Sequence, residues 1–184
     1  MAYPAAVPAI AIAAVASEAA TGLPAILTAA QCALESGWLD YAVGNNAFGV
    51  KWHKSQPIEQ RQLIRTREWF SRSYLDKWLT EPGYEGRQVI RETGRTRDTR
   101  FEFEVRDWFM KYATLADSFT AHARLIVTGA PYRKAWAEFQ GHKSPEKLLV
   151  DISKNYATSP TYAAEVADVM KMPALMKAIK EARK

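Results

Sequence analysis

Apolar positions recur at helical spacing near both ends of the chain. Ile26, Leu27, Ala30, Leu34 and Trp38 follow one another at steps of one, three and four residues, which predicts an amphipathic helix over 24–38. An alanine-rich segment before it predicts a helix over 8–20 that ends at a glycine. The same reasoning, with serine or proline at the start of several segments, predicts further helices over 115–127, 132–139 and 160–170, and from 145 and 173 onward.

The middle of the chain has a different pattern. Segments 87–93 and 100–108 alternate apolar and polar residues and are separated by a polar loop containing glycine, which predicts a β-hairpin. Before them, segment 58–79 has apolar residues at helix-like steps, although 64–69 fits an extended conformation equally well.

Helices, a small β-hairpin and more helices together predict an α+β fold that is mostly α. We expect a single domain, 1–184, with a helical lobe from 1–52 and 108–184 and a hairpin lobe from 53–107. Such a two-lobed plan favours a binding cleft between the lobes.

Composition narrows the class of protein. The net charge is +5, and segment 51–111 holds 14 Lys or Arg against 10 Asp or Glu, which suggests an anionic partner. Because the charges are mixed in sign, we do not expect nucleic-acid binding. One cysteine allows no internal disulfide, and three scattered histidines match no zinc spacing, so we expect no metal and no cofactor.

The N-terminal segment is apolar but has no positive region before it and contains two prolines, which is unlike a signal peptide. No apolar run approaches the 18 residues of a membrane span, so we expect no stable membrane insertion. We therefore expect the protein to be made in the cytoplasm without a recognisable signal peptide.

Glu35 is an acidic residue inside the apolar helix predicted over 24–38. On that helix its four neighbours would be Gln31, Cys32, Trp38 and Leu39, and the last three of these are apolar. Dry surroundings raise the pKa of a carboxylic acid, and an acid that stays protonated can protonate a glycosidic oxygen. By spacing alone, an ordinary, partly exposed glutamate near a helix end explains the residue as well.

Three motifs in order decide between these interpretations. The strings "ALESGW", "NNAFGVK" and "YATSPTYAAEV" resemble the bacterial cell-wall glucosaminidases of glycoside hydrolase family 73. The stretches "AILTAAQCALESGW" and "WFMKYATLADSFTAHARLI" are also similar to that family, so the resemblance covers most of the chain outside 53–86.

The resemblance implies a lysozyme-like fold and hydrolysis of the β-1,4 bond after N-acetylglucosamine in peptidoglycan. It implies that Glu35 is the general acid and that Tyr156 lies near the reaction centre. The substrate-binding positions that it implies are Asn45, Asn46, Phe48, Gly49, Lys51 and Tyr162. Asparagine amides suit an N-acetyl sugar because they both donate and accept hydrogen bonds. We add Trp52 as a further sugar platform.

A second carboxylate is harder to place. In the family it is a glutamate of the hairpin within a Thr-x-Glu-Tyr string that this chain lacks. Glu92 is the best positional match, with Glu102 and Glu104, which share one strand face, in reserve. Retaining, inverting and substrate-assisted mechanisms all stay open. The segment 53–86 is longer than the family usually has there, which suggests an extra helix, and Ser159 stands where the family often has aspartate.

The biological interpretation is a monomeric phage or prophage endolysin that acts on peptidoglycan glycan strands at the bacterial cell wall. An autolysin exported by another route is the alternative role. Two alternative activities are a muramidase or lytic transglycosylase on the same scaffold, and a non-catalytic module that binds the wall glycan.

Overall fold

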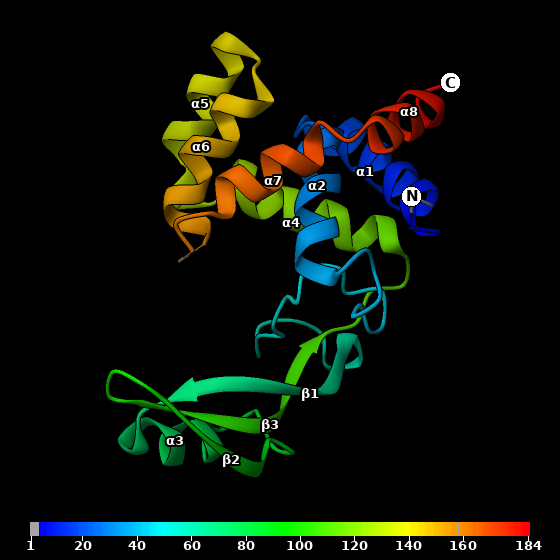
Figure 1. Cartoon of the computed structure of the whole chain (residues 1–184). Coiled ribbons are helices and arrows are strands. Elements are labelled where there is room, and N and C mark those ends of the chain that lie inside the picture. Colours follow the sequence, from blue (N-terminus) through cyan, green and yellow to red (C-terminus); the bar gives the residue numbers. More distant parts are fainter. Residues whose placement is uncertain (1–3, 158) are drawn as a thin grey trace. The chain divides into compact units, whose positions relative to one another are not determined.

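The computed structural model describes residues 4–157 and 159–184. The chain divides into two compact units, which are described separately (Figure 1). The helical unit comprises Met1–Gly49 and Tyr112–Lys184, and the sheet unit comprises Val50–Lys111. The expectation that the chain acts as one domain with a cleft stays a prediction.

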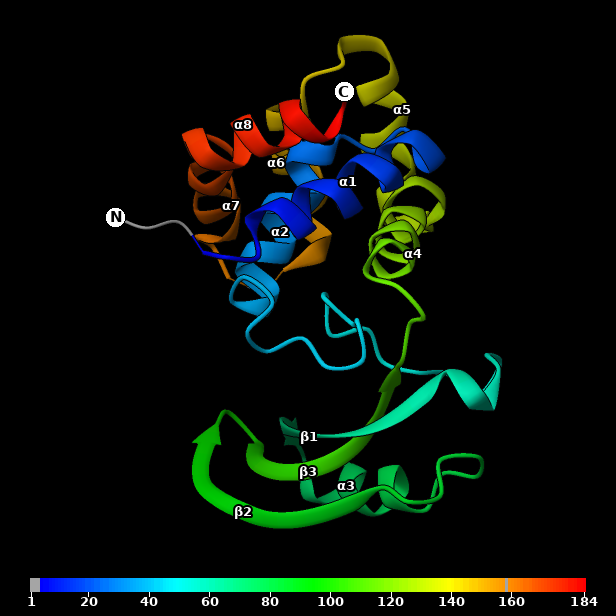
Figure 2. The same cartoon turned by 90° about the vertical axis from the view of Figure 1, so that its right-hand side faces the viewer.

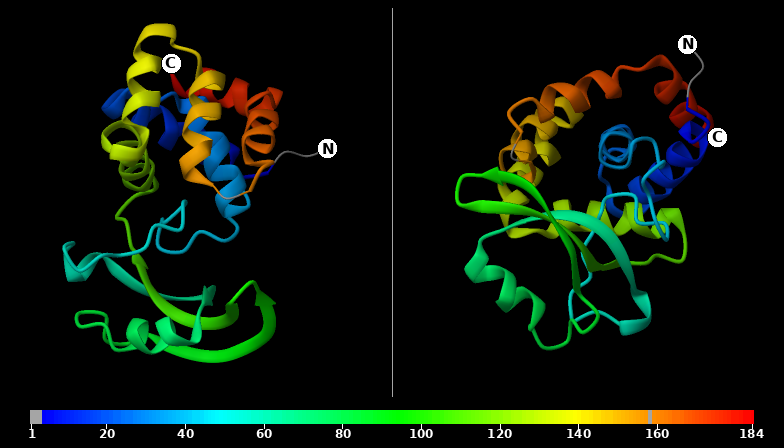
Figure 3. Two further views of the ribbon diagram at one scale, coloured as in Figure 1. Left: turned by 90° about the vertical axis from the view of Figure 1, so that its left-hand side faces the viewer. Right: turned by 60° about the horizontal axis from the view of Figure 1, so that its bottom comes forward.

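The helical unit is built on α1 (Val7–Thr21) and α2 (Ala25–Ser36). The chain returns to it with α4 (Leu115–Thr128), the short 3₁₀ helix η2 (Ala130–Tyr132), α5 (Arg133–His142), α6 (Pro145–Tyr156), α7 (Tyr162–Met170) and α8 (Pro173–Ala182). Helix α1 packs against α2, α4 and α8, while α2 also contacts α6 and α7. Figure 3 shows α2 enclosed by the other helices, and nine of its twelve residues are buried.

The predicted helices of this unit are confirmed, with differences at their ends. Ser144 caps α6 as expected, because its hydroxyl accepts a hydrogen bond from the amide of Lys147. Ser159 was expected to start a helix at 160 in the same way. Instead its hydroxyl binds the amide and hydroxyl of Thr161, and α7 begins two residues later, at Tyr162.

The sheet unit holds an antiparallel sheet in the order β1–β3–β2 (Figure 2). Its strands are β1 (Arg61–Phe70), β2 (Gln88–Arg97) and β3 (Arg100–Met110), with the 3₁₀ helix η1 (Ile58–Gln60) before β1. The predicted hairpin is confirmed as β2 and β3, with longer strands and a shorter loop. The helical interpretation of 58–79 is wrong for residues 61–70. The extended alternative is correct there, because this segment pairs with β3 along its whole length.

Helix α3 (Arg72–Leu79) is the extra helix expected in the long segment, and it covers one face of the sheet. Trp78 packs there with Phe70, Phe103 and Val105, which are all buried. The alternation of strand side chains therefore gives the sheet an apolar face toward α3 and an opposite face that carries mainly charged residues.

Candidate active site

Glu35 lies in the last turn of α2, one residue before the helix ends. The expected helix over 24–38 is too long, because Gly37 takes a left-handed conformation with φ of 56°, followed by Trp38 at 61° and Leu39 at 75°. Trp38 and Leu39 are therefore not the helical neighbours of Glu35 that the sequence suggested. The end of the helix instead places this side chain at the surface, where Glu35 as a residue is exposed.

Two tyrosines from other helices replace those expected neighbours. The hydroxyl of Tyr162, the first residue of α7, hydrogen-bonds the Glu35 carboxylate. Tyr156, the last residue of α6, stacks on Tyr162 with ring centroids 5.4 Å apart. Burial of the carboxyl group among these side chains raises the pKa of Glu35, and the hydrogen bond from Tyr162 partly opposes that rise. The acid is thus both reachable and partly desolvated.

A buried polar relay holds Tyr162 in place. The Gln31 side chain donates from Nε2 to the Tyr162 hydroxyl over 3.1 Å. The Oε1 atom of Gln31 lies 3.1 Å from Nε2 of His122 on α4, and because a carbonyl oxygen only accepts, the histidine nitrogen must donate. Burial lowers the pKa of His122 to about 3, so the ring is neutral at physiological pH. The relay runs from His122 through Gln31 and Tyr162 to Glu35.

Gln31 and His122 are functional candidates that the sequence did not single out. Both are essentially unexposed, at 0% and 1%. Gln31 stands one helical turn before Glu35, on a face that otherwise buries small apolar residues. A buried amide at that spacing was the available signal, because a buried polar side chain needs a partner. The partner on α4 lies 91 residues away in sequence, beyond the reach of pattern reasoning.

The loop after α2 is built largely by its own predicted site residues. Asn45 has φ of 60°, and its amide nitrogen donates to the carbonyls of Tyr112 and Ala113 at 3.0 Å each. Asn46 is buried. Phe48 is buried as well and stacks on the His122 ring with centroids 3.9 Å apart. These contacts give Asn45 and Phe48 structural roles in the helical unit.

Gly49 differs from its neighbours in this loop. It has φ of 60°, a conformation that costs other residues free energy, and nothing lies within 4 Å of the position that a Cβ would take. The backbone at Gly49 is therefore open to approach by another molecule.

Lys51 and Trp52 belong to the sheet unit. Lys51 forms ion pairs with Glu68 and Asp107, each at 2.6 Å. The Trp52 ring is only 5% exposed, because Tyr84 and Arg61 pack against it, and its Nε1 donates to the carbonyl of Pro57. Trp52 is therefore a packing residue of its unit, and the expectation that its ring offers an open platform to a sugar is wrong.

The three candidate partner carboxylates of the sheet unit have different surroundings. Glu104 is held by Arg65 and Arg91, whose hydrogen bonds lower the pKa of its carboxyl group to about 2. Glu102 is buried and accepts from the Thr93 hydroxyl over 2.7 Å.

Glu92 pairs across the sheet with Phe103, on the face toward α3. There it forms an ion pair with Arg72 over 2.7 Å, and its side chain stays 34% exposed. Among the three glutamates, Glu92 has the most accessible carboxylate.

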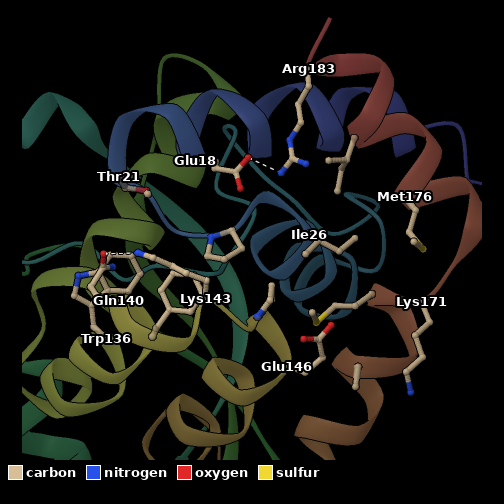
Figure 4. Close-up of a pocket in the computed structure, with 17 residues that line it drawn as sticks. Glu18, Thr21, Ile26, Trp136, Gln140, Lys143, Glu146, Lys171, Met176 and Arg183 are labelled. Atoms are coloured by element: carbon tan, nitrogen blue, oxygen red, sulfur yellow. Dashed lines mark hydrogen bonds and ion pairs between the residues drawn. The ribbon is translucent and has the colours of Figure 1, made fainter.

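A pocket of about 670 Å³ in the helical unit lies elsewhere (Figure 4). Pro24 and Ile26, at the start of α2, line it together with Trp136 of α5, whereas Glu35 stands at the other end of α2. Glu18 at its edge is engaged by Arg183 over 2.7 Å and by the amide of Ala25. We do not assign the glycosidic chemistry to this pocket, because Glu18 is paired with Arg183, and hydrogen bonds from its own backbone amide and from Ser144 lower the pKa of Glu146, the other acid that lines it.

Within residues 4–157 and 159–184, no cluster of three His, Cys, Asp or Glu side chains is arranged to hold a metal ion. No helix in this part of the chain is both long and apolar enough to span a bilayer. What the site does contain is a carboxylic acid of raised pKa and two tyrosines at the end of a buried helix. That arrangement suits proton donation to a sugar oxygen, and the fold is lysozyme-like.

The arrangement is thus that of a glycoside hydrolase, and comparison with known families identifies which one. The family model described as "Glucosaminidase: Mannosyl-glycoprotein endo-beta-N-acetylglucosaminidase" matches residues 11–175. The chain belongs to this family, glycoside hydrolase family 73. No curated protein matches the chain significantly.

Solved structures give the same fold. The catalytic domain of the autolysin Auto from Listeria monocytogenes superposes with a TM-score of 0.65 at 19% identity, covering 97% of this chain and 90% of that one. The glycoside hydrolase domain of Salmonella typhimurium FlgJ superposes with a TM-score of 0.59 at 21% identity, covering 94% of this chain and 86% of that one. A peptidoglycan hydrolase mutant from Sphingomonas sp. A1 gives 0.56 at 23% identity, with 92% and 93% covered.

Proposed function

We propose that this glycoside hydrolase is a peptidoglycan hydrolase that cleaves the β-1,4 bond between N-acetylglucosamine and N-acetylmuramic acid, with Glu35 as general acid. The observation that carries the proposal is the state of the Glu35 carboxyl group. Its pKa is raised, it accepts a hydrogen bond from the Tyr162 hydroxyl, and it lies within residues 11–175, which match the family model. The names of similar solved proteins, an autolysin and peptidoglycan hydrolases, support the choice of substrate.

In the proposed reaction, the protonated Glu35 gives its proton to the glycosidic oxygen while the bond from that oxygen to the anomeric carbon breaks. The glutamate becomes a carboxylate at that moment, and its new charge needs stabilisation. Tyr162 is suited to this role because its hydroxyl hydrogen-bonds the charged form, and Gln31 and His122 hold that hydroxyl in position. Tyr156 completes the wall of the site beside Tyr162.

We keep Glu92 as the proposed second carboxylate. The other two candidates are less suited to this role. Glu104 is a weak base whose charge is balanced by two arginines, and Glu102 is buried. Exposed ion pairs such as the one between Glu92 and Arg72 contribute only about 0–1 kcal/mol, so substrate can displace the arginine. Retention with Glu92 as nucleophile, inversion by a water that Glu92 activates, and attack by the substrate's own acetamido group are the three mechanisms to separate.

For substrate binding we propose the loop Asn45–Gly49 together with Lys51 and Tyr162. Gly49 offers an open backbone, whereas Asn45 and Phe48 act chiefly by holding the loop in shape.

We propose an endolysin as the biological role, in which the protein reaches the wall after the membrane is permeabilised. Lysis from within, only when a membrane-permeabilising protein is co-expressed, is the expected result in cells.

The activity is tested on purified peptidoglycan with wild type and Glu35→Gln. We expect wild type to release fragments whose new reducing end is N-acetylglucosamine, identified by borohydride reduction and mass spectrometry. Glu35→Gln should lower the rate at least about 100-fold, since general acids typically contribute 10²–10⁴. Glu138→Gln, another exposed helix glutamate of the same unit, is the matched control and should keep full activity.

Other outcomes have distinct meanings. A reducing-end N-acetylmuramic acid indicates a muramidase, and its anhydro form indicates a lytic transglycosylase. Wall binding without release of any fragment indicates a non-catalytic module. Full activity of Glu35→Gln shows that another residue is the acid.

A further inference from the structure

The sheet face opposite α3 carries an unusual density of arginine. Side chains at directly paired positions of a sheet point to the same face. Arg67 of β1, Glu104 of β3 and Arg91 of β2 therefore stand in one row, and Arg65 and Arg106 stand in the next. Arg65 and Arg106 are direct cross-strand partners, and like charges at such positions are destabilising. A fold that keeps this pair gives up stability there, which is typical of a functional surface.

Glutamates hold part of this surface in fixed positions. Arg65 and Arg91 each bind one oxygen of Glu104 through Nε, and Arg95 lies 3.6 Å from Glu102. The two glutamate side chains are only 9% and 6% exposed, whereas the three arginine side chains are 60–68% exposed. Arg65 and Arg91 bond Glu104 through Nε while most of each side chain remains exposed, so their guanidinium groups stay accessible to solvent.

The charge of this face is strongly positive. In the part of this face around Glu102 and Glu104, five arginines stand against the two glutamates: Arg65, Arg67, Arg91, Arg95 and Arg106. Hydrogen bonds from Arg65 and Arg91 lower the pKa of Glu104 to about 2. This glutamate therefore stays charged and continues to hold the two arginines. Guanidinium groups bind carboxylates and phosphates through paired hydrogen bonds, and groups already held in place lose less entropy when they do so.

We infer that this arginine face, formed by Arg65, Arg67, Arg91, Arg95 and Arg106, is a binding surface for the carboxylates of peptidoglycan stem peptides. The inference rests on the proposed function, which brings the protein to a mesh in which peptide carboxylates occur on every disaccharide. A phosphate-bearing wall polymer offers similar charges, but peptidoglycan hydrolysis does not require its presence. The surface would hold the enzyme on the wall between cleavage events.

The test measures binding of the Glu35→Gln protein to purified peptidoglycan from which phosphate polymers have been stripped. Arg67→Gln with Arg106→Gln removes two charges from the face and leaves the ion pairs of Glu104 intact. Arg124→Gln with Arg133→Gln removes the same charge from exposed helix positions and is the matched control. We expect the first pair to weaken binding about three- to tenfold at low salt and the second less than about twofold.

Two further arms identify the ligand. Removing the stem peptides with an amidase should abolish the difference between the two double variants, and so should raising the salt to about 0.5 M. Equal binding by both double variants overturns the inference. Binding that survives stem removal, or that appears only with a phosphate polymer, overturns the assignment to peptide carboxylates.

Activity on short peptide-free glycan strands separates this inference from the proposed function. The Arg67→Gln, Arg106→Gln variant in the otherwise wild-type chain should cleave such strands at the wild-type rate. If the wild-type protein cleaves nothing, the proposed function is wrong. If the protein cleaves normally but both double arginine variants bind the wall equally, only the proposed role of the arginine face is wrong.

Discussion

Replacing Tyr162 by phenylalanine tests the proposed control of the catalytic acid. The Tyr162 hydroxyl stabilises the ionised form of Glu35, so its removal should raise the pKa of Glu35 further. A hydrogen bond to a charged group contributes about 1.5–3 kcal/mol when buried. Because Glu35 is exposed as a residue, we reduce this to roughly 1 kcal/mol, or about 0.7 of a pKa unit.

The direction of the effect on activity follows from the protonation state. The proposed reaction needs protonated Glu35, so activity is lost as pH rises through the pKa of that residue. In Tyr162→Phe the alkaline limb of kcat/KM should therefore move to higher pH by about 0.7 unit. The maximal kcat should fall, because the carboxylate formed in the reaction loses a donor.

The assay is the pH dependence of kcat/KM on soluble glycan strands, together with a carboxyl ¹³C titration of Glu35. Tyr132→Phe is the matched control, since Tyr132 is also a buried tyrosine of the helical unit but does not hydrogen-bond Glu35. An alkaline limb that stays in place or moves to lower pH in Tyr162→Phe would refute the reasoning.

The remaining predictions concern the relay, the stability of the fold and its pH dependence. Gln31→Met should raise the pKa of Glu35 less than Tyr162→Phe does, while Thr28→Val, a buried polar change one turn earlier in α2, should leave it unchanged by ¹³C titration. Glu35→Gln should raise the thermal midpoint at pH 7 but not at pH 4, measured by calorimetry, because a raised pKa means that folding disfavours the ionised form above the unfolded pKa. For Glu104 the sign is opposite: its lowered pKa stabilises the fold above the unfolded value of about 4.5, so acid titration should lose that contribution between about pH 4.5 and 2, and Glu104→Gln should remove this step. Phe48→Ala should cost about 3–5 kcal/mol in urea unfolding, since it removes a buried ring that stacks on His122, and a loss under about 1 kcal/mol would contradict its packing role.

Local patterns determined the elements whose residues carry their own signal. Apolar periodicity and capping residues placed α1, α2, α4 and α6, and strict alternation placed the β2–β3 hairpin. The position of Glu35 near the end of α2 was also readable from the sequence, since one carboxylate interrupts an apolar helix. The motifs around it were enough to identify the family.

Segment 61–70 shows where local patterns fail. Its side chains fit a helix and a strand almost equally, and pairing with β3 decides for the strand, because a neighbouring strand satisfies the backbone hydrogen bonds along its whole length. Position 37 is similar: a glycine signals a weak helix, but only the backbone shows that α2 stops there and moves Trp38 and Leu39 away from Glu35.

The surroundings of the candidate acid were decided by tertiary structure alone. Glu35 receives its hydrogen bond from Tyr162, Gln31 holds the tyrosine, and His122 holds Gln31, so residues of three separate helices form the series of contacts that ends at this carboxyl group. Glu104 looked like a possible catalytic carboxylate in sequence, yet arginines from both neighbouring strands hold it. Sequence periodicity reports which face of an element is buried, whereas the charge that a carboxyl group can carry depends on atoms brought to it from distant parts of the chain.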